Sequence, residues 1–263
     1  MTMTQAAIAE LRERAGGGRM VVIALTDEEL TVLDGPDSQQ VAPRPWYDQQ
    51  DEATRQTACV VALRGLAARG IAVASEVSPA GGVTVALPQD VHAALAMRHA
   101  ASVIVVAHQQ TEPGMQARVL YSQGPELVLE EHVSAGGLHT FSLLPIGEAV
   151  QRLLELVDPH GVAKTVEPKG PVRTLTLTEV AAGEDGLGEL NDTRCVTILG
   201  KMSLDEDGKP VEERVSVYAL ADRVELADPR ERDGALMLEV GPVSTATLRE
   251  RLRDLLTDHR GRP

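Results

Sequence analysis

Residues 102–123, SVIVVAHQQTEPGMQARVLYSQ, hold two runs of apolar and β-branched residues around the break Glu112-Pro113-Gly114. Such runs on either side of a Pro-Gly turn predict a β-hairpin. Two further strand candidates follow, ELVLEEHV at residues 126–133 and LHTFSLL at residues 138–144, and the helical pattern IGEAVQRLLELV comes directly after them. The stretch therefore predicts an antiparallel meander of four strands that is closed by an amphipathic helix.

The same order of elements recurs in residues 194–256. There RCVTILGKMSL, ERVSVYAL, RVELAD and GALMLEV are strand candidates, and VSTATLRERLRDLL is helical. The apolar positions of the last strand and the closing helix also agree: Phe141 and Leu143 correspond to Leu238 and Val240, and Val150, Leu154 and Val157 correspond to Leu248, Leu252 and Leu255. A strand period of two and a helix period of 3.6 are independent signals, and both recur in the same order. The sequence thus predicts an internal duplication.

The predicted fold class is α+β, with two pseudo-symmetric halves that are each a mainly antiparallel sheet with packed helices. The first half spans residues 1–160 and the second spans residues 161–263, with a Pro- and Gly-rich linker at residues 158–171. RTLTLTEVAAG before the second copy weakly echoes MVVIALTDEELTVL before the first. Such sheets pack helices on one face and leave the other face or an edge for contacts. One compact domain overall is the alternative.

Residues 51–99 have no counterpart in the second half. The run up to Arg69 follows a helical period through Thr57, Val60, Val61, Leu63 and Leu66, and Gly70 is a natural helix end. IAVASEV and VTVAL then predict a hairpin, and QDVHAALAMRH predicts a second helix. The expected helix–hairpin–helix unit is a winged-helix-like insertion in the first half, an arrangement that some DNA-binding regulators use.

Charge and composition restrict the partners. The 263 residues include 25 Lys and Arg against 39 Asp and Glu, a formal net charge of −14, and aromatic residues make up 2%. A nucleic-acid binder needs clustered basic residues, and base stacking needs aromatic side chains. The sequence also lacks a signal-peptide-like apolar stretch at its N-terminus and any uninterrupted apolar run of about 18 residues. We therefore expect no nucleic-acid partner, no membrane partner and a cytoplasmic location.

The sequence contains no catalytic signature. His92, His99 and His108 are not arranged as HExxH, and the glycine runs fit neither GxGxxG nor a phosphate-binding loop. GxSxG is absent, and Cys59 and Cys195 form no CxxC pair; we expect Cys59, in a helical run, to be a buried thiol. The sequence predicts a protein that is not an enzyme and that holds no metal and no cofactor.

The tips of the first hairpin in each copy are candidate binding loops, because exposed loops on a rigid scaffold often carry function. The candidate partner-binding residues are Gln110, Met115 and Gln116 in the first tip and Asp205, Asp207 and Lys209 in the second. Met115 is an adaptable apolar contact residue. The alternative is that both tips are ordinary solvated loops.

The sequence resembles the EspG family, cytosolic chaperones of actinobacterial type VII secretion. The resemblance lies in LTDEEL (residues 25–30), LRGLAARGI (residues 63–71) and STATLRERLRDLL (residues 244–256), together with the two related α+β halves. It implies no catalysis and no cofactor. It also implies recognition of the tip of a helical PPE partner, whose apolar surface the chaperone shields before handing it to the secretion machine.

The leading hypothesis is a non-enzymatic cytosolic chaperone or adaptor that a helical protein partner contacts through apolar side chains on a sheet face or hairpin. Three alternatives stay open: a winged-helix DNA-binding regulator that uses residues 51–99, an enzyme with an unrecognised site, and a structural subunit of a larger assembly.

Overall fold

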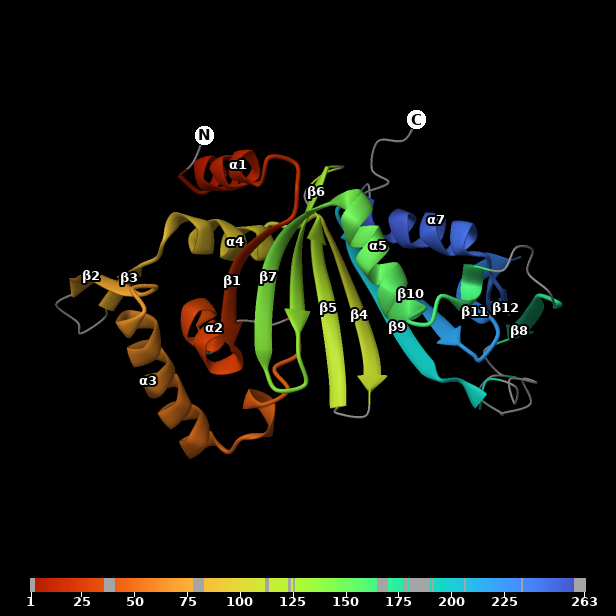
Figure 1. The fold of residues 1–263 in the computed structure, drawn as a ribbon, viewed down its shortest axis with the longest axis horizontal. Coiled ribbons are helices and arrows are strands. Elements are labelled where there is room, and N and C mark those ends of the chain that lie inside the picture. Colours follow the sequence, from red (N-terminus) through yellow and green to blue (C-terminus); the bar gives the residue numbers. More distant parts are fainter. Residues whose placement is uncertain are drawn as a thin grey trace.

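The computed structural model describes residues 3–35, 41–77, 83–111, 114–122, 124, 126–164, 170–176, 179, 190, 192–205, 207–232 and 234–257. These residues contain six α-helices, one ten-stranded antiparallel sheet and a separate two-stranded sheet (Figure 1). The predicted α+β class is confirmed.

The N-terminal elements begin with a helix, a strand and a second helix and continue into the predicted helix–hairpin–helix unit. They are α1 (Met3–Ala15), β1 (Met20–Thr26), α2 (Asp27–Asp34), α3 (Glu52–Ala68), β2 (Val73–Val77), β3 (Val83–Ala86) and α4 (Gln89–His99), with a short 3-10 turn at Tyr47–Gln49 before α3. β2 pairs with β3 antiparallel, and Gly70 takes a positive φ of 69° just after α3. The order of elements is as predicted, whereas the winged-helix comparison itself stays a prediction.

Both predicted meanders and both closing helices are present. The first copy is β4 (Val103–Thr111), β5 (Gly114–Ser122), β6 (Leu127–Val133), β7 (Leu138–Pro145) and α5 (Ile146–Val157). The second meander is β9 (Cys195–Leu204), β10 (Pro210–Ala219), β11 (Val224–Arg232) and β12 (Ala235–Pro242), closed by α7 (Thr245–Leu256). A 3-10 turn at Val162–Lys164 and β8 (Arg173–Thr176) precede it. Most of the segment that echoes β1 and α2, from residue 177 onward, lies outside the described residues.

The strands form one sheet rather than two. Its order is β1-β7-β6-β5-β4-β9-β10-β11-β12-β8, and β4 pairs with β9 antiparallel at the centre, with His108 opposite Ile198. The two meanders are therefore joined through the first strand of each. The sequence could not show this, because a strand's residue pattern does not name the strand that will pair with its outer edge.

Helices cover both faces of the first meander, which corrects the expectation of one covered face. On β4, Val103, Val105 and Ala107 pack in a core with α5 and α7, whereas Ile104 and Val106 pack on the opposite face in a core with α1, α2 and α4. The physical reason is visible in residues 103–107, VIVVA. A strand that is apolar at every position rather than at alternate positions is buried on both faces.

On this second face the described residues of the C-terminal half form a small cluster. Its buried members are Leu190, Leu220, Ala227 and Val240, with Leu175, Tyr218 and Leu238 packed against them. Between this cluster and the larger core of α1, α2 and α4, no helix of the described residues covers the middle of the sheet.

Candidate protein-binding surface

Apolar side chains are exposed in the middle of the sheet, on the face opposite α5 and α7. Met115 is 40% exposed, Val196 37% and Ile198 46%. We call this region the open sheet surface and define it by His108, Gln110, Met115, Val196, Ile198 and Tyr218 of strands β4, β5, β9 and β10. The three exposed apolar side chains lie on β5 and β9, on either side of β4, and apolar side chains that gather in one region have more significance than isolated exposed residues.

The strand register brings these residues to one face. His108 is opposite Ile198, Gln110 is opposite Met115, and Val196 is opposite Tyr218. Successive residues of a strand point to opposite faces, so the intervening residues point toward α5 and α7. There, Gln109 donates a hydrogen bond from Nε2 to the carbonyl oxygen of Leu156 at 2.6 Å. This bond ties the end of α5 to β4 and helps to fix which residues face outward.

His108 adds a polar atom to this surface without adding charge. Burial lowers the pKa of its imidazole below the ordinary value. Its Nδ1 has no hydrogen-bond partner among the described residues. At neutral pH the side chain is therefore neutral, which suits a surface that makes apolar contacts.

The predicted tip residues do not form one site. Gln110 and Met115 lie on the open sheet surface, but Gln116 is on the opposite face, where its Nε2 donates to Oε1 of Gln109 at 2.6 Å. The second tip lies at the other end of the sheet, because β4 and β9 are antiparallel and Val103 pairs with Ser203.

The second tip is closed by its own hydrogen bonds. Oδ1 of Asp205 accepts from the backbone N–H of Asp207 at 2.9 Å and of Lys209 at 2.8 Å, and Asp207 and Lys209 form an exposed ion pair. These contacts are those of an ordinary turn. A role of this tip in binding stays a prediction.

Sequence reasoning missed Val196 and Ile198. The run CVTIL marks β9 as a strand, and its alternation places Val196 and Ile198 on one face. The run does not show whether a helix covers these two residues. Their exposure depends on how far the N-terminal helices extend over the sheet.

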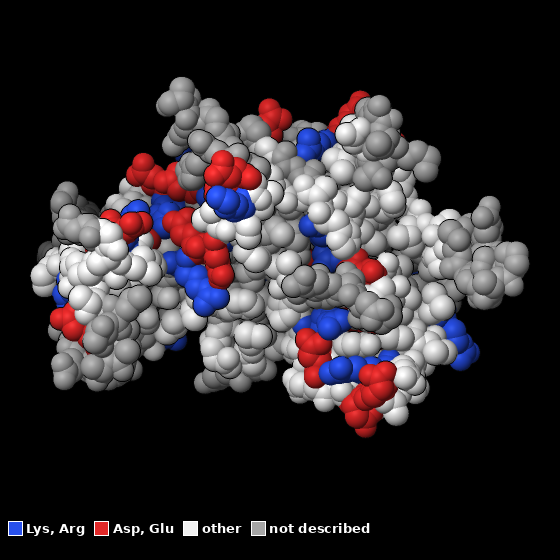
Figure 2. All heavy atoms as spheres, turned by 180° about the vertical axis from the view of Figure 1, so that it is seen from behind, with Lys and Arg blue, Asp and Glu red and all other residues white. Residues whose placement is uncertain are grey.

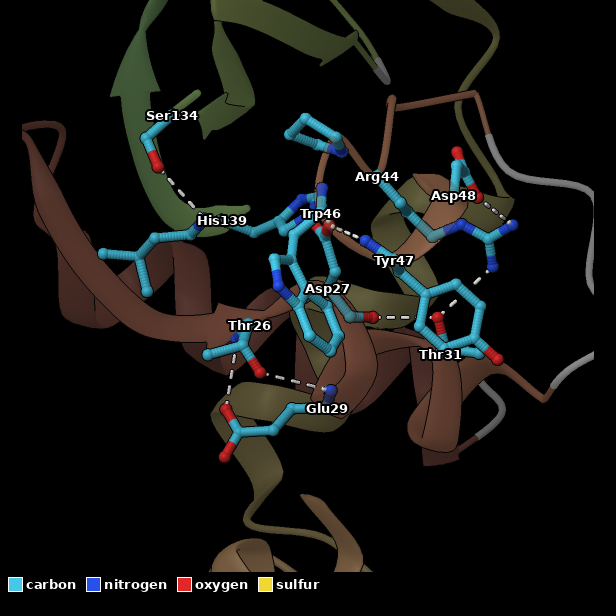
Figure 3. Close-up of polar contacts among 12 residues, drawn as sticks. Thr26, Asp27, Glu29, Thr31, Arg44, Trp46, Tyr47, Asp48, Ser134 and His139 are labelled. Carbon is cyan, nitrogen blue, oxygen red and sulfur yellow. Dashed lines mark hydrogen bonds and ion pairs between the residues drawn. The ribbon is translucent and has the colours of Figure 1, made fainter. Parts of the chain in front are cut away.

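A buried polar cluster joins α2 to the sheet in the N-terminal half of the chain (Figure 3). Oδ1 of Asp27 lies 2.7 Å from Nε2 of His139, and Oδ2 accepts from the backbone N–H of Trp46 at 2.8 Å and of Tyr47 at 2.9 Å. Nδ1 of His139 lies 2.6 Å from Glu131. Asp27, Glu131 and His139 have no solvent-exposed surface, so this cluster holds the loop before α3 and offers no substrate site.

The electrostatics of this cluster agree with a buried ion-pair network. Burial lowers the pKa of His139, but the hydrogen bonds and charges of Asp27 and Glu131 outweigh burial and raise that pKa overall. Burial likewise raises the pKa of Glu131, and His139 and Arg98 outweigh it and lower that pKa. A protonated His139 between two carboxylates is the consistent charge state.

Two further features bear on chemistry. No group of three or more His, Cys, Asp or Glu able to hold a metal ion occurs among the described residues. Cys59 is half-buried rather than buried as expected, because it borders a surface groove together with Tyr47, Val60 and Leu63. Its Sγ lies 3.5 Å from the hydroxyl of Tyr47, and burial together with this contact raises the pKa of Tyr47 to about 12.

Charges on the visible surface are mixed in sign. Figure 2, seen from behind relative to Figure 1, shows red and blue side chains next to one another with uncharged surface between them. The part of the chain that the structure describes has no helix long and apolar enough to cross a membrane.

These features define a class: an α+β protein with one long antiparallel sheet, helices on both faces and an exposed apolar region at the sheet centre. No protein-family profile matches the sequence, and a search of curated proteins finds no similar sequence. Solved structures do match. One is the type VII secretion system chaperone EspG5 of Mycobacterium tuberculosis in complex with the PE25–PPE41 dimer, with a TM-score of 0.58, 11% sequence identity, and coverage of 89% of this chain and 95% of that chain. The resemblance to the EspG family therefore extends to the fold.

Proposed function

We propose that this chain is a non-enzymatic chaperone or adaptor that binds a helical protein partner on the open sheet surface. The observation that carries the proposal is the exposure of Met115 on β5 and of Val196 and Ile198 on β9, the two strands that flank β4 in one continuous sheet. The fold likeness to EspG5, whose structure holds it in complex with the PE25–PPE41 dimer, supports a partner of that helical type and a place in type VII secretion.

The dimensions of the surface fit one helix. It spans β5, β4, β9 and β10, which are consecutive in the sheet. Neighbouring strands lie about 4.8 Å apart, so the four strands cover about 14 Å. An α-helix with its side chains is about 10–12 Å across. A helix with an apolar stripe can thus lie over Ile198 and Met115 and remove both from water, and burial of each such side chain favours binding.

The proposal includes an internal duplication. From the central β4–β9 pair, the strand order reads β4, β5, β6, β7, β1 in one direction and β9, β10, β11, β12, β8 in the other. Each half also has an ion pair between the third strand of its meander and its closing helix, although the two arginines differ by one position in the helix alignment. Glu130 of β6 bonds Arg152 of α5 at 2.9 Å, and Asp228 of β11 bonds Arg251 of α7 at 2.9 Å. The domain halves at residues 1–160 and 161–263 are proposed on the same basis.

Affinity capture with a matched control tests the function. The tagged full chain, Ile198→Asp and Val211→Asp are each used to capture proteins from a native extract. Ile198 and Val211 are both exposed β-strand residues, but Val211 lies near the second hairpin tip. We expect one stoichiometric, predominantly helical protein with the wild type and with Val211→Asp, and its loss with Ile198→Asp. Capture of no stoichiometric protein, or equal capture by all three chains, would contradict the proposal.

A further inference from the structure

Helix α3 exposes an apolar face that the rest of the described chain does not cover. Val60 is 61% exposed and Val61 is 60% exposed, and only Ala62 and Leu66 of the helix are buried. The helix packs mainly against α2, at the end of the molecule away from β9 and β10 (Figure 1). This face is therefore distinct from the open sheet surface.

The exposed residues follow the spacing of a helix–helix seam. The residues Ala53, Thr57, Val60, Arg64 and Ala67 are separated by four, three, four and three positions, and all are exposed. This alternation is the a and d pattern of paired helices, and its small residues allow a close approach of two backbones. No helix of the described residues packs against this row of α3 residues, so the row is available to a helix of a partner.

Shallow grooves run along both sides of the seam. Trp46 and Glu28 border one groove together with Thr57 and Val61, and Tyr47 borders the other together with Val60 and Leu63. The buried carboxylate of Asp27 accepts backbone hydrogen bonds from both Trp46 and Tyr47. The groove walls are thus fixed before any partner arrives, which lowers the entropic cost of docking.

We propose that α3 of a second copy of this chain occupies this face in an antiparallel pair. The charges along the helix select this occupant. Glu52 is in the first turn, and Arg64 lies about 18 Å further along the axis at a rise of 1.5 Å per residue. Arg64 has no ion-pair partner among the described residues. In a two-fold antiparallel pair centred near Ala58, Glu52 of each copy lies beside Arg64 of the other, and the helix dipoles oppose favourably.

Sedimentation of the full chain over a range of concentrations tests the pairing. We expect a reversible dimer. Glu52→Arg and Arg64→Glu should each weaken dimerisation about tenfold or more, because each places like charges together twice at the symmetric interface. An equimolar mixture of the two variants should recover a heterodimer, since both ion pairs are then restored, one in its native sense and one with the charges reversed. No partner other than a second copy predicts this recovery.

Two controls separate the pairing from effects on folding. Arg253→Glu makes the same charge change at an exposed position of α7 and should leave dimerisation unchanged. Thermal unfolding of each variant verifies that the fold is kept. A chain that is monomeric at every accessible concentration, a dimer that neither substitution weakens, or a mixture that does not recover association would each overturn the proposal. Because Ile198→Asp leaves α3 unchanged, loss of partner capture and loss of dimerisation remain separate results.

Discussion

Nε2 of His139 lies 2.7 Å from Oδ1 of Asp27, and neither side chain reaches solvent. The other ring nitrogen lies 2.6 Å from Oε1 of Glu131, whose Oε2 accepts from Nε of Arg98 at 3.0 Å. Both carboxylates need a donor from the imidazole, so both ring nitrogens carry protons. Two acids and two bases thus join α2, α4, β6 and β7 on one face of the sheet, and Asp27 extends this network to the loop that borders α3.

Replacing Asp27 with Asn tests the network. The amide nitrogen would face either the His139 donor or the two backbone donors of Trp46 and Tyr47, so one contact must be lost. Breaking a buried ion pair by changing one partner costs about 3–5 kcal/mol. We expect a loss of that order in urea unfolding. We also expect red-shifted fluorescence from Trp46, the one tryptophan in the sequence, as its loop is released.

Asp48→Asn is the matched control for this prediction. Asp48 belongs to the same loop and pairs with Arg44 at 3.0 Å, but its side chain is more than half exposed. Exposed pairs contribute about 0–1 kcal/mol. Equal losses in the two variants would contradict the network's role in holding the loop.

The pH dependence of stability should reflect His139. Its pKa is raised in the folded state, so its contribution is fully present below the ordinary value of about 6.5 and is lost as the pH rises through the folded pKa. Glu131 has a lowered pKa, so its contribution is present above its ordinary value and is lost as the pH falls through the folded pKa. We expect the free-energy difference between wild type and His139→Gln, from urea unfolding, to shrink from pH 6 to pH 9. A constant difference would contradict a protonated His139.

Substitution of Gly137 tests how tightly the backbone packs against Asp27 in the cluster of Asp27, Glu131 and His139. The φ of Gly137 is 77°, and an added Cβ would lie 2.7 Å from Oδ2 of Asp27. Gly208 has the same φ of 77°, but an added Cβ there would meet no described atom within 4 Å. A left-handed conformation costs a non-glycine residue about 1–2 kcal/mol at either site. Gly137→Ala should therefore lose more unfolding free energy than Gly208→Ala, and equal losses would show that Asp27 moves aside freely.

The sequence predicts the elements well because their signals are local. The alternation of residues 138–144 and the helical stripe of α5 lie within single elements. At α2, the pattern Thr-x-x-Glu forms a capping box, in which Thr26 and Glu29 bond each other's backbone N–H groups. Each of these patterns needs only neighbours a few residues apart, so it can be found without knowing the fold.

The candidate sites depend on distant packing, and local patterns could not give them. Val60 and Val61 belong to a clear helical period, yet the face they occupy stays open because α2 covers the other side of α3. Met115 and Asp205 both lie near hairpin tips, but the antiparallel β4–β9 pairing places those tips at opposite ends of the sheet. Tertiary packing decides which strand pairs with each sheet edge and how much of each sheet face a helix covers.

Lys201 offers a test of which face of β9 is covered. It is 4% exposed and points toward α7, where Nζ donates to the carbonyl oxygens of Thr257 at 3.0 Å and Asp254 at 3.3 Å. These carbonyls end the helix, and a cation there offsets the helix dipole. Lys201→Met should cost about 1–3 kcal/mol, because two buried acceptors lose their charged donor. Amide hydrogen exchange should quicken in the last turn of α7.

Lys209→Met is the matched control. It removes a lysine from the exposed second hairpin tip and should change neither the unfolding free energy nor the amide exchange of α7. Unchanged exchange in Lys201→Met would mean that α7 does not end on this strand, and the open sheet surface on the reverse side of β9 would lose its basis.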